Sequence, residues 1–375
     1  MKKICIISEF YPYKDEPRFP FVQQLAYSMS NEDVECVVIA PQSITRNIIR
    51  KTPIKPVETI DVSPDKKNIK VIRPWIITFS NSKNIFLQWL ADKIMENAIK
   101  RGVKKEMRNL DAIYCYFWHV GLMTSEALKK YNIPIYIQAS ECELTIHTYM
   151  KKKCYIDRVK HVICASNKNR IESIEAGLTQ IDKTTIVPNG YRNDEFYPIP
   201  KNVCRKKLNY APDKFIVVFL GGFIERKGIR QLVSVLNRFD DVYSIFIGQG
   251  EEPPTCKNIL FCDKLEHNEI VDYLNCGDVF VLPTKAEGCC NAIIEALACG
   301  LPVISSNKSF NDEILNDRCS IRIDESNEEE LYNAIELLKK DKDLRKKMSS
   351  AALEKAKMLT IEHRAKAIRK LIFKE

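Results

Sequence analysis

The sequence predicts an α/β protein built from two doubly wound, Rossmann-like domains, each around a parallel sheet. Short apolar runs alternate with helix-length amphipathic segments along the whole chain, which is the pattern of repeated strand–helix units. At 375 residues the chain is also too long for one typical hydrophobic core. Near its middle, Asn189-Gly190 and Pro198-Ile199-Pro200 supply turn and linker residues, so we expect a domain boundary at about residue 195.

Each predicted domain has its own set of strands. In the first domain, residues 1–195, strands are expected at 3–8, 34–40, 69–73, 112–116, 134–138, 161–165 and 184–188. In the second domain, residues 196–359, they are expected at 215–220, 243–247, 258–262, 278–282, 302–305 and 319–323. The stretch 44–67 is rich in Pro, Thr, Lys and Arg without clean periodicity, which predicts a loop. Helical patterns at 327–340, 342–357 and 361–373 end the chain.

The composition describes a soluble globular protein, with 45% apolar and 29% charged residues. No apolar run is long enough to cross a bilayer, and the run after Lys2-Lys3 is short and ends in Glu9, which predicts a first strand rather than a signal peptide. The 14 cysteines are scattered and include no C-x-x-C pair. We therefore expect reduced, mostly buried thiols in a cytoplasmic protein.

The net charge of +9 lies entirely in the first half of the chain. Residues 1–190 contain 29 Lys and Arg against 20 Asp and Glu, whereas residues 191–375 contain 29 of each kind. A one-sided basic surface suggests an anionic partner such as nucleic acid, anionic lipid headgroups or a pyrophosphate-bearing substrate. Ordinary solvated lysines would give the same count, so both interpretations stay open.

The most informative segment connects a predicted strand to a predicted helix. Asp278–Pro283 is a short apolar run closed by proline, and an apolar helix is expected to begin near Cys290. The first free N–H groups of that helix, at about Cys289, Cys290, Asn291 and Ala292, point out of the carboxyl edge of the sheet, where they can hold a phosphate. Gly288 removes a side chain that would keep a ligand away.

Two acids flank this phosphate cradle. Glu287 lies on the loop, and Glu295 follows eight positions later on the helix. Carboxylates beside a phosphate are better suited to accept hydrogen bonds from hydroxyl groups, and a ligand with both phosphates and many hydroxyls is a sugar nucleotide. A helix-surface acid is the ordinary alternative for Glu295, but its apolar neighbours disfavour it.

A second glycine loop follows the strand at 215–220. Gly221 and Gly222 permit a sharp turn and close backbone approach, while Arg226 and Lys227 bring cations toward a diphosphate. Gly248-Gln249-Gly250 resembles part of a dinucleotide fingerprint. No G-x-G-x-x-G follows the first strand, however, so an NAD enzyme is disfavoured.

Several of these segments resemble the motifs of one enzyme family, the retaining glycosyltransferases of family four (glycosyl transferases group 1), which have the two-domain GT-B fold. Glu287 to Glu295 resembles the E-x7-E signature, Phe219 to Gly228 the phosphate loop, Ala296 to Val303 the "EA.acG.PV" run, and Asn189-Gly190 with Phe196 and Pro198 the interdomain segment. The likeness extends from about residue 160 to residue 316, in the family's order. The resemblance implies two Rossmann-like domains that face each other across a cleft, with residues from about 360 onward crossing back onto the first domain.

The resemblance also implies roles for these residues. Glu295 is expected to bind the ribose hydroxyls and Glu287 the hydroxyls of the transferred sugar. Arg226, Lys227 and the helix start near Cys290 are expected to stabilise the departing diphosphate, which takes the acceptor proton itself. No protein base, cofactor or metal ion is expected. Many relatives carry arginine at the position of Gly222, so one phosphate contact is missing here or supplied by Arg226.

The acceptor side departs from the family pattern. The family's histidine after the strand at 134–138 is absent, and Ser140 or Glu141 stands near its place. His119 follows the preceding strand and could reach the cleft, although a histidine beside two aromatic residues is more often a core or capping group. Arg18 and Phe21, in an aromatic first loop, are further acceptor-site candidates, with burial under a helix as the alternative.

The stretch 85–108 predicts a basic amphipathic helix. It could rest on an anionic membrane that presents a lipid-linked acceptor, or it could be a core-facing helix with one wet side. The sequence thus favours a cytoplasmic enzyme, peripheral on the inner face of the cell membrane. It would transfer a hexose from a UDP-sugar to a surface polysaccharide or lipid-linked oligosaccharide. The alternatives are a nucleotide-sugar epimerase on the same fold and a basic nucleic-acid-binding protein, which lacks a recognisable binding motif here.

Overall fold

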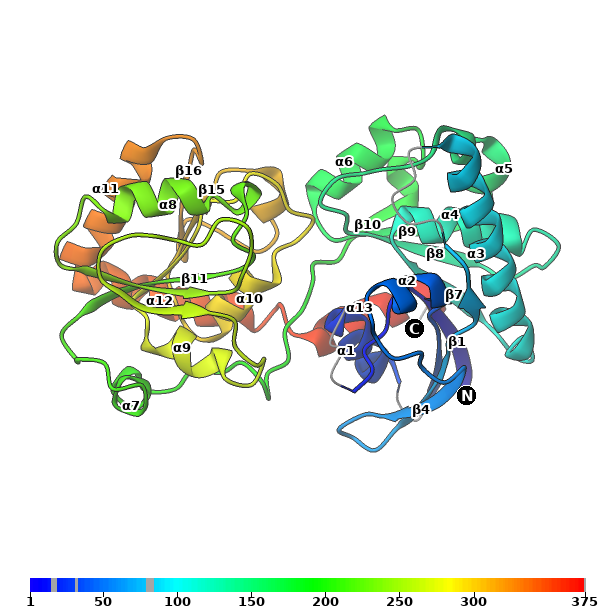
Figure 1. The fold of residues 1–375 in the computed structure, drawn as a ribbon, viewed down its shortest axis with the longest axis horizontal. Helices are drawn as coiled ribbons and strands as arrows, with labels where there is room; N and C mark the ends of the chain where they lie inside the picture. The colour runs from blue at the N-terminus through cyan, green and yellow to red at the C-terminus, as the bar shows by residue number, and fades with distance from the viewer. Residues whose placement is uncertain (15–18, 31–32, 79–83, 374–375) are drawn as a thin grey trace. The chain divides into compact units, whose positions relative to one another are not determined.

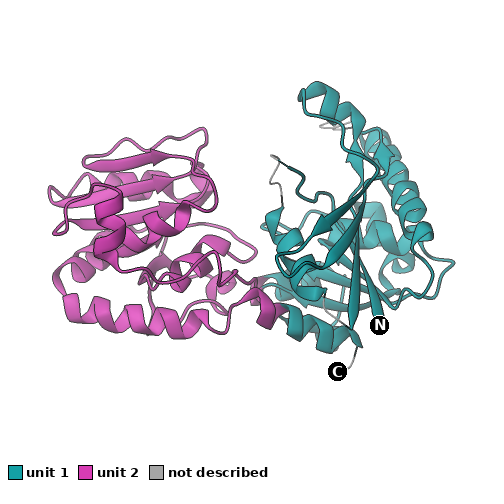
Figure 2. Cartoon of the chain, turned by 90° about the horizontal axis from the view of Figure 1, so that it is seen from below, with its two compact units in different colours: residues 1–165, 169–187, 365–375 teal, residues 166–168, 188–364 magenta. Residues whose placement is uncertain are grey.

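The computed structural model describes residues 1–14, 19–30, 33–78 and 84–373, which divide into two compact units (Figure 2). The N-terminal unit comprises residues 1–165, 169–187 and 365–375, and the C-terminal unit comprises residues 166–168 and 188–364. The division falls between Val187 and Pro188 rather than at residue 195. Tyr191 explains the difference, because its backbone pairs with Leu359 and Ile361 of the C-terminal unit.

The N-terminal unit is organised around an eight-stranded sheet of order β10-β9-β8-β7-β1-β2-β5-β4. All neighbours are parallel except β4, which runs antiparallel to β5. The strands are β1 (Lys2–Ile7), β2 (Val34–Ile39), β4 (Glu58–Val62), β5 (Asn68–Ile72), β7 (Ala112–Tyr116), β8 (Ile135–Ala139), β9 (Val159–Cys164) and β10 (Thr184–Ile186). A separate short pair joins β3 (Gln42–Ser43) to β6 (Trp75–Ile76).

Helices cover both faces of this sheet (Figure 1). The chain leaves β1 toward β2 and leaves β7 toward β8, so the helices of these two crossovers lie on opposite faces. The helices are α1 (Pro20–Met29), α2 (Ile44–Ile49), α3 (Ile85–Lys105), α4 (Trp118–Ala127), α5 (Lys153–Ile156), α6 (Asn167–Glu175) and α13 (Ile361–Phe373). In the part of the chain that the structure describes, none of the helices is long and apolar enough to cross a bilayer.

The C-terminal unit is a six-stranded parallel sheet of order β13-β12-β11-β14-β15-β16. Its strands are β11 (Phe215–Leu220), β12 (Val242–Ile247), β13 (Ile259–Asp263), β14 (Val279–Leu282), β15 (Val303–Ser306) and β16 (Ser320–Ile323). Its helices are α7 (Lys201–Lys207), α8 (Ile229–Leu236), α9 (Ile270–Cys276), α10 (Asn291–Ala298), α11 (Glu328–Lys340) and α12 (Lys342–Ala356). α8 and α11 pack together on one face, and α10 and α12 pack together on the other (Figure 1).

Every strand predicted from the sequence is present to within about two residues, and the α/β class is confirmed. The loop predicted over 44–67 is wrong, because this stretch forms α2 and β4. β4 was missed because it is an edge strand whose exposed and half-buried residues alternate, with Ile60 and Val62 exposed to solvent. Asp61 of β4 accepts hydrogen bonds from Tyr11, Gln23 and Tyr27. These contacts stabilise the edge strand against the rest of the N-terminal unit.

Candidate functional site

The C-terminal unit brings its two loops of interest to one edge of its sheet. β11 and β14 are neighbours, and the chain leaves them in opposite directions, toward β12 and toward β15. This is the topological switch point of a doubly wound sheet, where ligands bind beyond the carboxyl ends of the strands. The loop after β11 carries Arg226 and Lys227, and the loop after β14 carries Glu287.

Two glycines allow the loop after β11 to pack against the turn after β12. A Cβ atom at Gly248 would lie 2.0 Å from the carbonyl oxygen of Gly221, and one at Gly250 would lie 2.3 Å from that of Phe223. No larger residue fits at either position without moving the backbone. In contrast, a Cβ atom at Gly222 would meet no atom closer than 3.9 Å, so the loop has room for a side chain there.

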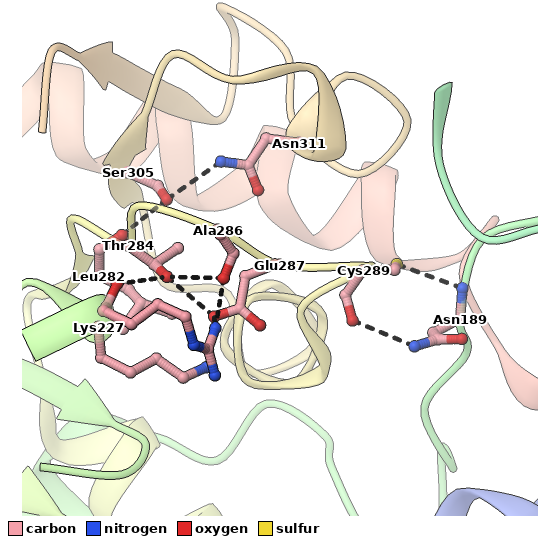
Figure 3. A network of polar contacts seen from close by, with 10 residues as sticks. Asn189, Lys227, Leu282, Thr284, Ala286, Glu287, Cys289, Ser305 and Asn311 are labelled. Atoms are coloured by element: carbon pink, nitrogen blue, oxygen red, sulfur yellow. Dashed lines mark hydrogen bonds and ion pairs between the residues drawn. The ribbon is translucent and has the colours of Figure 1, made fainter. Parts of the chain in front are cut away.

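Arg226, Lys227 and Glu287 form one ionic cluster. Figure 3 shows Lys227 and Glu287 of this cluster beside Thr284 and Ala286. The Lys227 Nζ lies 2.5 Å from Glu287 Oε1, and Arg226 Nη1 lies 3.1 Å from the same oxygen. Thr284, fully buried, donates its hydroxyl to Oε1 at 2.9 Å. Arg226 also donates to the carbonyl of Ala286, which fixes the guanidinium beside the loop. The sequence predicted the two cations and the acid as one site, but it did not indicate the part played by Thr284.

All three hydrogen bonds to Glu287 end on Oε1. Within the described residues, its other oxygen, Oε2, accepts none. A carboxylate can accept bonds at both oxygens, so Oε2 remains able to accept a ligand hydroxyl. Burial alone would lower the pKa of Lys227, but the Glu287 carboxylate beside it raises that pKa, so the ammonium is charged at neutral pH. At neutral pH the cluster therefore carries one net positive charge.

Asn189 holds the start of α10 in place. Its side-chain amide donates to the carbonyl of Cys289 at 3.1 Å (Figure 3). The same amide donates to the Asn291 side chain at 2.9 Å. Gly288 is buried in the same loop, and Cys290 is the N-cap residue of the helix, with no side-chain cap bond. The first turn of α10 therefore follows directly from the loop that carries Glu287, as the sequence predicted.

Glu295 lies on α10 and is half-buried. Burial raises its pKa to about 7, although the nearby His267 lowers it in part and Glu195 raises it further. His267 is itself engaged by Glu195, at 3.1 Å. Within the described residues the Glu295 carboxylate makes no hydrogen bond or ion pair. A half-buried acid without a partner is costly in a structural role, and this favours a ligand contact over an ordinary surface acid.

The two cysteines beside the site are neutral thiols. Burial raises the pKa of Cys289 to about 12 and that of Cys290 to about 11, so neither is a thiolate at neutral pH. All 14 cysteines of the chain are free, and nine of them are buried. This confirms the prediction of unpaired, mostly buried cysteines.

In the N-terminal unit, His119 lies in a cluster around the buried Asp92 of α3. His119 Nε2 is 3.2 Å from Asp92 Oδ1, and His147 Nδ1 is 2.8 Å from Oδ2. The Tyr149 hydroxyl donates to Oδ2 as well. The ligand atoms of the two histidines and the aspartate lie within 4.8 Å of one another, so these residues could hold a metal ion, which the sequence did not predict. The hydrogen bonds to both carboxylate oxygens satisfy the same group without a metal.

The other acceptor-side candidates have mainly structural contacts. Glu141 accepts hydrogen bonds from the backbone N–H groups of Trp118 and Ser140, which caps the start of α4. Phe21 packs in an aromatic group with its ring stacked on Phe19, at a centroid distance of 5.0 Å. Arg18 lies outside the described residues.

A cavity of about 210 Å³ in the N-terminal unit was not predicted. It lies beyond the carboxyl ends of β1, β2, β5 and β7, at the switch point of that sheet. His119 and Asp92 form part of its lining, together with Arg46 and Arg73. In the sequence, the segments that line this cavity share one feature: each follows a predicted strand or lies next to one.

Two Rossmann-like units, each with polar groups at its switch point, define a two-unit α/β protein of the kind that binds nucleotide-linked substrates. Residues 201–355 match the family described as "Glycosyl transferases group 1". The putative teichuronic acid biosynthesis glycosyltransferase TuaC of Bacillus subtilis is 24% identical over 325 residues, which is 81% of each chain. The O-antigen biosynthesis glycosyltransferase WclY of Escherichia coli is 27% identical over 168 residues, 43% of this chain and 47% of WclY.

Solved structures share the fold over the whole chain. Sucrose-phosphate synthase from Thermosynechococcus elongatus has a TM-score of 0.79 at 17% identity and covers 100% of this chain and 99% of its own. Anabaena Alr3699/HepE in complex with UDP-glucose has a TM-score of 0.73 at 15% identity and covers 100% of both chains. The match to the glycosyl transferases group 1 family covers residues 201–355, which is most of the C-terminal unit. The chain is a retaining glycosyltransferase with the GT-B fold, which confirms the resemblance seen in the sequence.

Proposed function

We propose that the chain transfers a hexose from a UDP-sugar to a surface polysaccharide or a lipid-linked oligosaccharide, with retention of the anomeric configuration. The observation that carries this proposal is the cluster at the switch point of the C-terminal unit. Two cations and an acid converge there, and all bonds to the acid fall on one of its oxygens.

The donor would be held by three kinds of contact. Lys227 and Arg226 would bind the diphosphate, assisted by the first turn of α10. Glu287 would accept a hydrogen bond from the transferred sugar through Oε2. Glu295 would accept bonds from the ribose hydroxyls, which accounts for a half-buried acid that has no partner among the described residues.

The proposed chemistry is charge stabilisation at the leaving group. As the bond between the sugar and the diphosphate breaks, negative charge develops on the diphosphate, and Lys227 and Arg226 would stabilise that charge. The departing diphosphate would take the acceptor proton, so no protein base is required. The neutral thiols of Cys289 and Cys290 would take no covalent part.

Relatives support the choice of donor and acceptor. Anabaena Alr3699/HepE is a neighbour in complex with UDP-glucose, which supports a UDP-linked donor. TuaC and WclY are named for teichuronic acid and O-antigen biosynthesis, and LpsE of Rhizobium meliloti for lipopolysaccharide core biosynthesis, which supports a surface glycan as acceptor.

We further propose a cytoplasmic enzyme that contacts an anionic bilayer through the start of α3. Ile85 and Phe86 are 75% and 64% exposed, and Phe86 stacks on Trp89, which is 40% exposed. The rest of α3 buries Ile99 and Val103, so the helix is part core and part exposed apolar surface. The excess positive charge of residues 1–190 complements anionic headgroups.

Incubation of the protein with labelled nucleotide sugars and a membrane extract tests the function. Label that moves from UDP-glucose or a related UDP-sugar into a lipid or glycan fraction supports the proposal. An isomerised donor without transfer would instead identify an epimerase. Sedimentation with anionic and with zwitterionic vesicles tests the membrane contact, and Phe86→Ser with Trp89→Ser should abolish binding to the anionic vesicles.

A further inference from the structure

Arg73 is a buried cation without an ion-pair partner. Its side chain is 2% exposed and follows β5 at the carboxyl edge of the N-terminal sheet. It donates to the Thr59 hydroxyl and to the carbonyl of Pro12, while its Nε has no hydrogen-bond acceptor. Among the described residues, no carboxylate forms an ion pair with it, although the Asp61 carboxylate is near enough to favour its charge. A buried guanidinium with an unsatisfied Nε donor is costly, so a ligand acceptor would stabilise it.

A second unpaired guanidinium lines the same cavity. Arg46 of α2 forms no salt bridge with any described residue, and its guanidinium lies 5.6 Å from the ring centroid of Phe10. That of Arg73 lies 5.9 Å from the ring centroid of the next residue, Tyr11. Both cations therefore flank one short segment after β1, and both reach the cavity of about 210 Å³.

Other residues of the lining have different chemistry. Glu9, Asp92 and His119 also line the cavity, and carboxylate and imidazole groups can form hydrogen bonds with hydroxyl groups. The cavity is smaller than the ~300 Å³ at which pockets for drug-sized molecules begin. Its size suits one sugar residue rather than a longer glycan.

We infer that this cavity binds the terminal sugar of an acceptor that carries an oxyanion, a carboxylate or a phosphate group, with Arg46 and Arg73 on the oxyanion. This inference rests on the proposed function for its statement that the ligand is an acceptor. The pair of guanidiniums recognises a charged group, and the two acids and the histidine of the lining recognise the sugar hydroxyls. Planar guanidiniums suit both carboxylate and phosphate oxygens, so the two sources of the oxyanion must be separated by experiment.

Binding of small probes to the full-length protein tests the inference. Glucuronate, glucose 6-phosphate, glucose and inorganic phosphate are titrated separately by calorimetry. We expect one or both of the charged sugars to bind and glucose to bind at least tenfold more weakly. Preference for glucuronate identifies a carboxylate acceptor, and preference for glucose 6-phosphate identifies a phosphorylated one. Equal binding of glucose, or binding of inorganic phosphate with no gain from a sugar, would overturn the inference.

Arg46→Gln should weaken binding of the charged sugar at least tenfold, because it removes one charge-assisted contact. Arg50→Gln is the matched control, since Arg50 is an exposed arginine one turn further along that does not line the cavity. Arg73→Lys keeps the buried charge but loses the planar guanidinium with its several N–H donors. It should weaken binding without lowering the melting temperature by more than a few degrees. If Arg46→Gln and Arg73→Lys both bind the charged sugars as the wild type does, the assignment is wrong.

A separate titration with UDP keeps this test independent of the proposed function. UDP is expected to bind through the C-terminal unit, so its binding reports on the donor site alone. If UDP does not bind but the charged sugars do, the proposed donor is rejected. Retained UDP binding without any binding of charged sugars would reject the inference about the cavity.

Discussion

Replacement of Lys227 by alanine is the sharpest test of the proposed donor site. Lys227 is largely buried and lies 2.5 Å from Glu287 Oε1, so its ammonium has a fixed position. A unit charge about 4 Å from a second one contributes about 4 kcal/mol at an effective dielectric constant of 20. Removal of a comparable preorganised donor in other enzymes lowers kcat by about 10²–10³ fold. We expect a loss of this size in kcat for Lys227→Ala.

The assay measures kcat from transfer of labelled sugar under saturating donor and acceptor. KM for the acceptor, measured by varying the acceptor at saturating donor, should change little, because the lost contact is to the donor. The melting temperature should fall by only a few degrees. Glu287 keeps its bonds to Arg226 and Thr284, so it is not left unpaired in the variant. Measurements well below the melting temperature separate this effect from catalysis.

Lys285→Ala is the matched control. Lys285 belongs to the same loop as Glu287 but pairs with Glu225 at 2.7 Å and is partly exposed. Its removal should change kcat by less than about twofold, because it pairs with Glu225 and not with Glu287, and an exposed ion pair also contributes little to stability. A kcat for Lys227→Ala within threefold of the Lys285→Ala value would refute the proposed role of Lys227.

Three further predictions follow from the same geometry. Because burial raises the folded pKa of Glu295 from 4.5 to about 7, its ionisation costs stability, so the free energy of unfolding should fall as pH rises from 4.5 to 7. UDP affinity should rise over pH 6–8 as the carboxylate forms, and Glu295→Gln should flatten both dependences, as measured by urea unfolding and calorimetry. Gly222→Arg should fold normally and bind UDP up to tenfold more tightly in a direct titration. In contrast, Gly248→Ala should lower the melting temperature strongly, because its Cβ would lie 2.0 Å from a carbonyl oxygen. A thiol reagent at pH 8 should modify the exposed Cys154 first and Cys262 next, and fast loss of the Cys289 thiol would contradict its raised pKa.

The sequence was a good guide to the sheets for a physical reason. Parallel strands that are buried on both faces are almost wholly apolar, so each one appears as a short hydrophobic run. β11 and β14 are of this kind. Parallel sheets also place the carboxyl ends of their strands at one edge, so residues just after two apolar runs can meet although they are about 60 positions apart. Arg226 and Glu287 do so.

The N-terminal cavity could not be predicted in the same way. Arg46 lies on a six-residue helix without apolar periodicity, and Arg73 follows a strand as a single basic residue among many. Asp92 lies in the middle of α3, where an acid is normally a solvated surface residue, yet it is buried. Its burial depends on His119 and His147, which come from distant segments. Such a cluster has no local signature, because every partner is supplied by tertiary packing.

Glu287 shows why one acid can serve both the fold and the proposed chemistry. Without it, Arg226 and Lys227 would be two adjacent, partly buried cations that repel each other, and the loops after β11 and β14 would lose the ion pairs of Glu287. Glu287 pairs with both cations through Oε1 alone, and the same oxygen accepts a hydrogen bond from Thr284. Oε2 is therefore held in a fixed direction and can still accept a hydroxyl. Because one carboxylate faces two cations, the cluster keeps a net positive charge, and the same residues can attract a diphosphate while they orient a sugar.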